Sequence, residues 1–200
     1  MAAPIDFYFD FSSPYGYFAS QQIDAIAGKY GREVTWRPIL LGAVFKVTGA
    51  QPLPSLPLKG EYSRRDILRC ARLLDLPYQW PAKFPIPTQA PARAVYWAQK
   101  TDTQKAKTLA QTLYRAYFGH NQDISSPEVT AQVAAGIGYD GAAVAAAIND
   151  PAIKDKLKAE VDDAIAKGVF GSPYIVIDGE PFWGHDRLGQ VEKWLATGGW

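Results

Sequence analysis

Hydrophobic and polar positions change their period several times along the chain, and each change predicts an element of secondary structure. Residues 5–11 alternate, with aromatic or β-branched side chains at the odd positions, which predicts a strand. Apolar residues then recur every three or four positions from Tyr15 to Tyr30, which predicts one face of a helix that ends at Gly31. Residues 33–39 return to a strand pattern. The first forty residues are therefore expected to form a β-α-β unit.

A proline-rich segment and then a long helical region fill the middle of the sequence. We expect a loop from Leu40 to Gly60, because prolines gather at its centre. From there to about residue 168, apolar stripes at helical spacing predict helices, with helix starts at Ser126 and Asp140. The stripes and helical segments are Ile67, Cys70, Ala71 and Leu74, residues 93–99 and 106–118, and Ile153, Leu157, Val161 and Ile165.

Strand signals return near the end of the sequence. Residues 174–177 form a short apolar run, and Asp178-Gly179 is a strong two-residue hairpin turn before a return strand over residues 180–183. A last helix is expected to follow, with an apolar stripe made of Leu188, Val191, Trp194 and Leu195. The chain therefore ends in a β-β-α unit.

This order of elements predicts the fold class. Strands at both ends of the chain must share one sheet, so a β-α-β unit, a helical block and a β-β-α unit indicate an α/β protein. We expect a thioredoxin-like fold with a large all-helical insertion. Residues 1–40 and 169–200 would form the thioredoxin-like core, and residues 41–168 the helical insertion domain.

Composition and charge narrow the class of protein. A chain of 200 residues that is 48% hydrophobic and 20% charged favours one globular domain, or one domain with a large insertion, over disorder. A net charge of +1 gives no electrostatic footprint for nucleic acid or anionic lipid, and no apolar run approaches the roughly 20 residues of a membrane span. Residues 1–6 lack a signal-peptide pattern. We therefore expect a cytoplasmic protein with no nucleic-acid or membrane partner.

The single cysteine and the two histidines have unremarkable surroundings in the sequence. Cys70 excludes an internal disulfide, and its place in a helical stripe favours a packing role in the core. His120 and His185 lie far apart and lack companion ligands. We therefore expect no metal site.

The first candidate site is the junction Ser13-Pro14-Tyr15-Gly16, where the first strand passes into the first helix. Ser13 suits a helix N-cap, and Pro14 suits the first helical position. Oxidoreductases of this fold keep Cys-x-x-Cys here, so the missing cysteines exclude dithiol exchange by this segment. A helix start gathers N–H groups that stabilise an anion. Ser13 is therefore either a cap alone or a donor to a thiolate that a ligand brings.

Three further positions are candidates for binding the same ligand. Pro173 follows Ser172 just before the third strand, and it is either an ordinary trans proline or a cis proline that exposes the Ser172 backbone to an extended peptide such as glutathione. Asp186, at the start of the last helix, is either a capping acid or a receptor for the amino group of a γ-glutamyl moiety. Lys59 is either a solvated lysine or the partner of the other carboxylate of a tripeptide.

These motifs together resemble a known family over nearly the whole chain. The segments concerned are residues 7–11, Ser13-Pro14-Tyr15, residues 36–42, Phe84-Pro85, Ala92-Arg93, residues 123–125, residues 168–171 with Pro173, and residues 184–188. The chain is similar to the 2-hydroxychromene-2-carboxylate isomerase family, which is related to kappa-class glutathione transferases and more distantly to DsbA-type oxidoreductases. It departs from the family pattern at Gly16, where relatives often have serine, and at Ala50 and Thr88, where asparagine occurs.

The resemblance implies roles for individual residues. Ser13 would contact the glutathione sulfur and act in catalysis, and a loop near residues 50–60 would also contact glutathione. The glutathione-binding residues that it implies are Pro14, Tyr15, Lys59, Ser172, Pro173, His185 and Asp186. It also implies glutathione as the cofactor, a small aromatic carboxylate as the substrate, and a homodimer.

The implied activity is a glutathione-dependent isomerisation. It would interconvert 2-hydroxychromene-2-carboxylate and trans-o-hydroxybenzylidenepyruvate through a transient glutathione adduct, as part of aromatic-compound catabolism. A kappa-class-like glutathione transferase that conjugates electrophiles is the first alternative. The second is a thioredoxin-like binding or chaperone module without catalytic activity.

Overall fold

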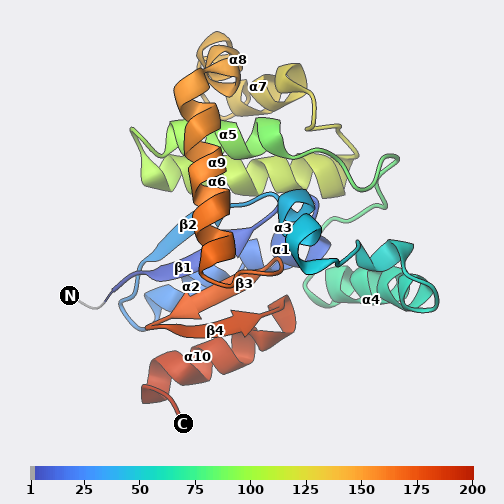
Figure 1. Ribbon diagram of the computed structural model, residues 1–200, viewed down its shortest axis with the longest axis vertical. Helices are drawn as coiled ribbons and strands as arrows, with labels where there is room; N and C mark the ends of the chain where they lie inside the picture. The colour runs from blue at the N-terminus through green and yellow to red at the C-terminus, as the bar shows by residue number, and fades with distance from the viewer. Residues whose placement is uncertain (1–2) are drawn as a thin grey trace.

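The computed structural model describes residues 3–200, and its strands form one mixed sheet in the order β2-β1-β3-β4 (Figure 1). The central strand β1 (Ile5–Phe9) runs parallel to β2 (Val34–Pro38) and antiparallel to β3 (Tyr174–Ile177), which pairs antiparallel with β4 (Glu180–Trp183). Strands from the two ends of the chain therefore share one sheet, as predicted. The thioredoxin-like fold is confirmed.

Helices make up most of the rest of the chain. Their bounds are α1 (Pro14–Ser20), α2 (Ile23–Gly28), α3 (Leu41–Thr48), η1 (Leu53–Ser55), α4 (Lys59–Leu73), α5 (Gln89–Ala98), α6 (Thr103–Tyr114), the π-helix η2 (Arg115–Gly119), α7 (Pro127–Ala135), α8 (Gly141–Asn149), α9 (Pro151–Ala166), η3 (His185–Arg187) and α10 (Leu188–Thr197). In Figure 1, α5 to α8 gather at one end of the molecule, α9 leads from that group back to β3, and α10 lies beyond β4. The proposed division into a core and an insertion domain stays a prediction.

Burial of β1 on both faces places the core at the centre of the sheet. Ile5, Phe7 and Phe9 have no exposed surface, and Tyr8 is 1% exposed. The edges of Phe7 and Phe9 pack against Trp36 of β2, with ring centroids 5.1 and 5.4 Å apart. Aromatic pairs of this kind stabilise a core beyond the area that they bury. This packing holds the end of β1 in place, and with it the turn that leads to Ser13.

The first strand and the first helix are both shorter than predicted. The strand ends at Phe9, not at residue 11, because the Asp10 amide turns out of the sheet and donates to the Ser172 hydroxyl at 2.9 Å. The single helix expected from Tyr15 to Tyr30 is two helices. The side-chain amide of Gln22 donates to the Phe18 carbonyl, and such bonds compete with the helical ladder where α1 ends.

The predicted loop from Leu40 to Gly60 is wrong over its first half, where α3 forms. Its prolines all follow the helix, and Gly49, with a φ of 73°, ends α3 in the left-handed conformation typical of helix C-termini. Val44 is buried and anchors the helix to the core. The missed signal was helical spacing within a segment interpreted from its prolines alone.

The remaining structural predictions can be compared with the same structure. Asp178 and Gly179, with φ of 52° and 93°, form the predicted hairpin turn between β3 and β4. Cys70 is half-buried on α4 and packs against the edge of the core. No helix within residues 3–200 has the length and apolar character needed to cross a membrane.

Candidate functional site

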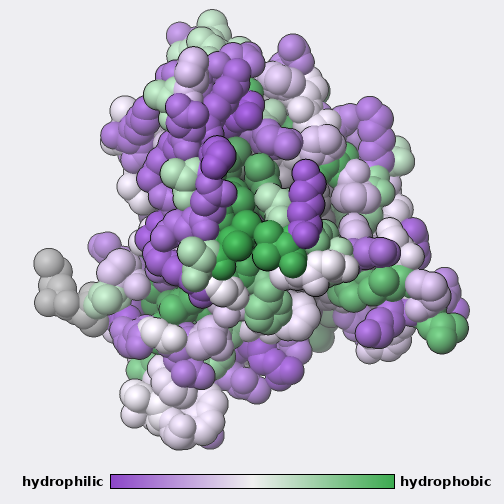
Figure 2. All heavy atoms as spheres, in the orientation of Figure 1, coloured by the Kyte–Doolittle hydropathy of each residue, from purple (hydrophilic) through white to green (hydrophobic). Residues whose placement is uncertain are grey.

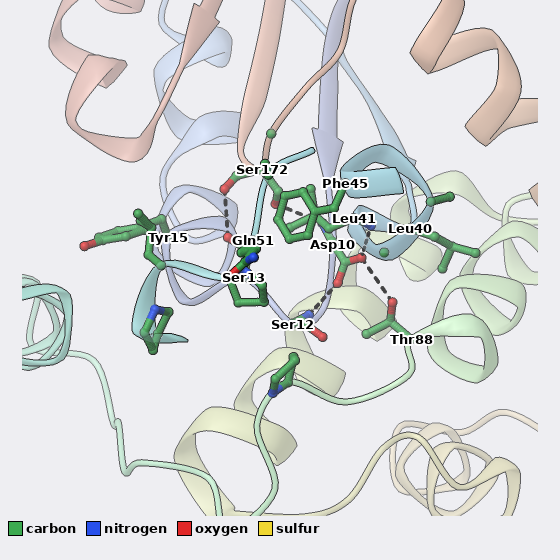
Figure 3. Close-up of a pocket in the computed structure, with 18 of the residues that line it drawn as sticks. Asp10, Ser12, Ser13, Tyr15, Leu40, Leu41, Phe45, Gln51, Thr88 and Ser172 are labelled. Atoms are coloured by element: carbon green, nitrogen blue, oxygen red, sulfur yellow. Dashed lines mark hydrogen bonds between the residues drawn. The ribbon is translucent and has the colours of Figure 1, made fainter. Parts of the chain in front are cut away.

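Ser13 lies where the turn after β1 becomes α1. Its hydroxyl oxygen accepts the Gly16 amide at 3.0 Å. The hydroxyl proton is donated to the Ser172 carbonyl at 2.8 Å (Figure 3). Pro14 occupies the first helical position, so the predicted helix start is confirmed. The Ser13 hydroxyl is thus a cap and, at the same time, a donor aimed at a segment 159 residues further along the chain.

The Ser172–Pro173 peptide bond is cis in the structure, which decides between the two conformations that the sequence left open. Ser172 faces Ser13 from the turn before β3. Its hydroxyl accepts the Asp10 amide at 2.9 Å, and its carbonyl accepts the Ser13 hydroxyl. The Ser172 amide makes no hydrogen bond within residues 3–200. A ligand with an extended backbone would therefore find an unpaired N–H at this turn.

Gly16 allows these segments to approach each other. A Cβ at Gly16 would lie 2.6 Å from the Tyr114 hydroxyl and 2.9 Å from the Ser172 hydroxyl. Tyr114 is fully buried, and its hydroxyl donates to the Asp10 carbonyl at 2.9 Å. The departure from the family pattern at Gly16 therefore has a structural reason: hydroxyl groups fill the space that a side chain would need.

Asp10 is the buried polar centre of the site, and the sequence interpretation missed it. One carboxylate oxygen accepts the Ser12 amide at 2.6 Å, and the other accepts the Leu41 amide at 2.6 Å and the Thr88 hydroxyl at 3.2 Å (Figure 3). Asp10 is 2% exposed. The available signal was one acid within a run of aromatic residues, which a buried strand does not accommodate without partners.

The Asp10 carboxyl has a perturbed acidity. Burial raises its pKa to about 6, and the hydrogen bonds from the Leu41 and Ser12 amides and from the Thr88 hydroxyl partly offset that rise. A carboxyl in this range changes its charge near neutral pH. Strongly perturbed pKa values of this kind are concentrated at functional sites.

A cavity of about 910 Å³ opens beside Ser13 and Ser172. Its walls are mainly apolar, and Figure 2 shows hydrophobic residues gathered in a hollow near α3, between polar side chains. Apolar side chains that line it are Leu40, Leu41, Phe45, Leu53, Leu56, Ile67, Phe84, Ile86, Phe170 and Trp183. Lys46 of α3 is the only cationic side chain among the described residues that line it. The cavity thus combines apolar walls, one cation and the Ser13 hydroxyl.

The remaining residues predicted to bind glutathione fall into two groups. Pro14, Tyr15 and Ser172 line the cavity with Ser13, whereas Lys59, Pro173, His185 and Asp186 do not. The Tyr15 ring stacks on His185, with centroids 5.0 Å apart, so the start of η3 lies beside α1.

The side chains around Tyr15 and His185 make further contacts. The Tyr15 hydroxyl donates to the Asp66 carboxylate at 2.8 Å, and burial lowers the pKa of His185, which favours its neutral form. Lys59 is exposed at the first position of α4. The binding roles of Lys59, Pro173, His185 and Asp186 stay predictions. Within residues 3–200, no group of three or more His, Cys, Asp or Glu side chains is placed to hold a metal ion.

Comparisons with known proteins identify the family of this chain. The family model for the DSBA-like thioredoxin domain matches residues 4–196. A 2-hydroxychromene-2-carboxylate isomerase of Sphingobium xenophagum is 28% identical over 205 residues, which cover 98% of this chain and 99% of that protein. The glutathione S-transferase kappa 2 of Caenorhabditis elegans is 25% identical, over 96% of this chain and 92% of its own.

A solved structure gives the same result for the fold. A 2-hydroxychromene-2-carboxylate isomerase superimposes with a TM-score of 0.87 at 26% identity, over 97% of this chain and 95% of that chain. The resemblance inferred from the motifs is therefore confirmed over the whole length of the fold. The relatives' names point to isomerases and glutathione transferases.

Substitution of Gly16 tests the close packing at the helix start. Gly16→Ala should lower the free energy of unfolding by about 1–3 kcal/mol, because its methyl group must displace two hydrogen-bonded hydroxyls. Gly28→Ala is the matched control, since no atom lies within 4 Å of its added Cβ. Denaturant unfolding of the two variants gives the comparison. Equal stability of both variants would contradict the packing that we describe.

The Asp10 carboxyl predicts a pH dependence of stability with a defined sign. Its pKa is raised in the folded state to about 6 from the ordinary value of 3.8, so its protonation favours folding. That contribution is complete below the ordinary value and is lost as the pH rises through about 6, with a size of about 3 kcal/mol. Unfolding of wild type and Asp10→Asn across this range isolates it. A wild-type-minus-variant difference that does not change with pH would disprove the assignment.

Proposed function

The chain belongs to the family of DSBA-like thioredoxin domains, and we propose that it is a glutathione-dependent isomerase of 2-hydroxychromene-2-carboxylate. The observation that carries the proposal is the convergence of the Ser13 hydroxyl and the Ser172 backbone at a large apolar cavity. The isomerase relatives, matched over nearly their whole length, support it. The interconversion with trans-o-hydroxybenzylidenepyruvate is the finer part of this proposal.

The nucleophile must come from outside the protein, because the only cysteine, Cys70, lies on α4 and does not line the cavity. When bound, glutathione supplies a sulfur nucleophile for addition to the substrate and later departure from it. Ser13 then has one task, which is to stabilise the sulfur anion. Its hydroxyl turns from the Ser172 carbonyl, giving up a neutral hydrogen bond worth about 1 kcal/mol, and donates a charge-assisted bond worth about 1.5–3 kcal/mol.

We assign the binding of glutathione to the edge of the cavity formed by the start of α1 and the turn before β3, with η3 beside α1. The unpaired Ser172 amide, held by the cis bond to Pro173, would pair with the peptide backbone of the ligand. His185 and Asp186 would receive the γ-glutamyl end beside Tyr15, and Lys59 the opposite carboxylate. The kappa-class relatives, whose name states that they are glutathione transferases, support this assignment.

The second substrate would occupy the apolar part of the cavity. Phe45 of α3 and Phe170 line the cavity and would pack against an aromatic substrate, and Lys46 would pair with its carboxylate. Isomerisation returns the thiol unchanged, whereas a kappa-class-like transferase would consume it. A homodimer in the cytoplasm completes the proposal.

The proposed reaction can be tested by incubating the protein with glutathione and 2-hydroxychromene-2-carboxylate. We expect isomerisation without net thiol consumption, and a stoichiometric loss of thiol would indicate the transferase. Ser13→Ala should lower kcat about tenfold to a hundredfold, because its contact is made to the sulfur anion, with little change in glutathione affinity by calorimetry. Ser20→Ala, which removes a buried hydroxyl at the other end of α1, is the control. Unchanged turnover in Ser13→Ala would remove Ser13 from the mechanism.

The carboxylate contact is tested with Lys46→Met, which keeps most of the side-chain length and removes the charge. We expect KM for the carboxylate substrate to rise roughly tenfold with kcat nearly unchanged, since binding to the carboxylate is the same in the ground and transition states. A methyl ester of the substrate provides the control, because its turnover should not depend on Lys46. An equal loss for acid and ester would assign Lys46 to the shape of the wall instead of to charge.

A further inference from the structure

The side chain of Asp10 joins three segments that form the site. Its carboxylate accepts hydrogen bonds from Ser12 in the turn before α1, from Leu41 at the first position of α3, and from Thr88, the residue before α5. The N-cap positions of α3 and α5, Leu40 and Thr88, have no side-chain cap of their own. At α3, Asp10 therefore performs from just beyond β1 the task that a local cap performs elsewhere in the chain, whereas at α5 it binds the side chain of the N-cap residue Thr88.

These bonds run across the cavity wall. Leu41, Phe45 and Lys46 of α3 line one side of the cavity, and Thr88 with the segment before it lines another. Ser12 belongs to the turn that places Ser13. One buried carboxylate thus sets the position of α3 and the Thr88 segment, which we call the substrate wall, relative to Ser13. Asp10 belongs to the cavity lining, but only 2% of its surface is exposed. Its side chain therefore supports the residues that line the cavity and is nearly inaccessible to solvent.

A carboxylate in this position costs stability. Asp10 forms no ion pair within residues 3–200, so only neutral donors compensate for its burial. The titratable groups that face it are Tyr114 of α6 and Tyr117 of η2, and the negative charge of Asp10 contributes to the raised pKa of each phenol. Neither group supplies a positive charge. Both carboxylate oxygens accept hydrogen bonds here, whereas the NH₂ end of an amide only donates, so a neutral amide cannot serve all three donors.

We infer that Asp10 is a positioning residue, whose ionised carboxylate holds the amino end of α3 and the Thr88 segment in register with the Ser13 turn. This inference rests on the proposed function for its kinetic readout only. Asp10 acts through α3 and Thr88 and does not contact the sulfur. The backbone hydrogen bonds from Asp10 to Ser13 and Ser172 do not depend on its side chain. Substitutions of the side chain should therefore displace the substrate wall and leave the glutathione-binding residues near Ser13 and Ser172 in place.

Asp10→Asn tests this division of roles. An amide of the same shape places an NH₂ group against one of the backbone N–H donors, so α3 or the turn loses its partner. We expect KM for the hydroxychromene carboxylate to rise about tenfold or more, while glutathione affinity by calorimetry changes less than about threefold. In wild type, KM should also rise as the pH falls through about 6, and this dependence should be absent in the variant. Asp102→Asn, at the N-cap of α6, is the control.

A second readout does not need turnover. Hydrogen–deuterium exchange of residues 41–48 should be about tenfold faster in Asp10→Asn than in wild type, and unchanged in Asp102→Asn. Should Asp10→Asn fail to fold, Thr88→Val keeps the carboxylate and removes one donor. We then expect a severalfold rise in KM for the carboxylate substrate with unchanged glutathione affinity.

The outcomes separate the two proposals. Absence of isomerisation by wild type, with faster exchange of α3 in Asp10→Asn, would overturn the function and support the positioning role. Unchanged α3 exchange and unchanged KM in a folded variant would overturn the positioning role. A parallel loss of glutathione affinity and substrate affinity would also overturn it, because Asp10 would then support the whole site without distinction.

Discussion

At the end of β1 every polar group of Asp10 bonds to a different part of the chain. Its amide reaches Ser172, its carbonyl accepts the Ser13 amide and the Tyr114 hydroxyl, and its carboxylate reaches the turn, α3 and Thr88. Six hydrogen bonds from one buried residue leave little freedom in how these segments meet. The aromatic core holds the end of β1 in place, and the hydrogen bonds of Asp10 then hold the surrounding segments against that end. The candidate site depends on both.

The Ser13–Ser172 bond joins the start of α1 to the turn before β3. In a dithiol enzyme of this fold the two corresponding positions belong to a redox cysteine and to the residue before a cis proline. Here a hydroxyl and a carbonyl satisfy each other across the same gap. In the proposed function a sulfur anion would compete with that bond, and it would be favoured because a hydrogen bond to a charge is stronger than one to a neutral carbonyl.

Part of the cavity is formed by a segment whose sequence predicts a loop. The prolines after residue 50 concealed α3, yet this helix carries the cation and much of the apolar surface next to Ser13. The N-cap residue of this helix, Leu40, makes no side-chain cap, and the Asp10 carboxylate just after β1 accepts the Leu41 amide instead. A pattern confined to neighbouring residues cannot reveal a partner about thirty residues away.

The sequence by itself determined the order of strands and helices along the chain, the helix start at Ser13 and Pro14, the hairpin at residues 178–179, and the family. These features depend on local periodicity, on capping chemistry and on turn residues, which act over a few positions. The tertiary structure alone decided that Ser13 donates to Ser172, that Gly16 must lack a side chain, and that Asp10 is buried with an altered acidity. Those properties arise from desolvation and from contacts between distant segments, and only the folded chain brings such groups together.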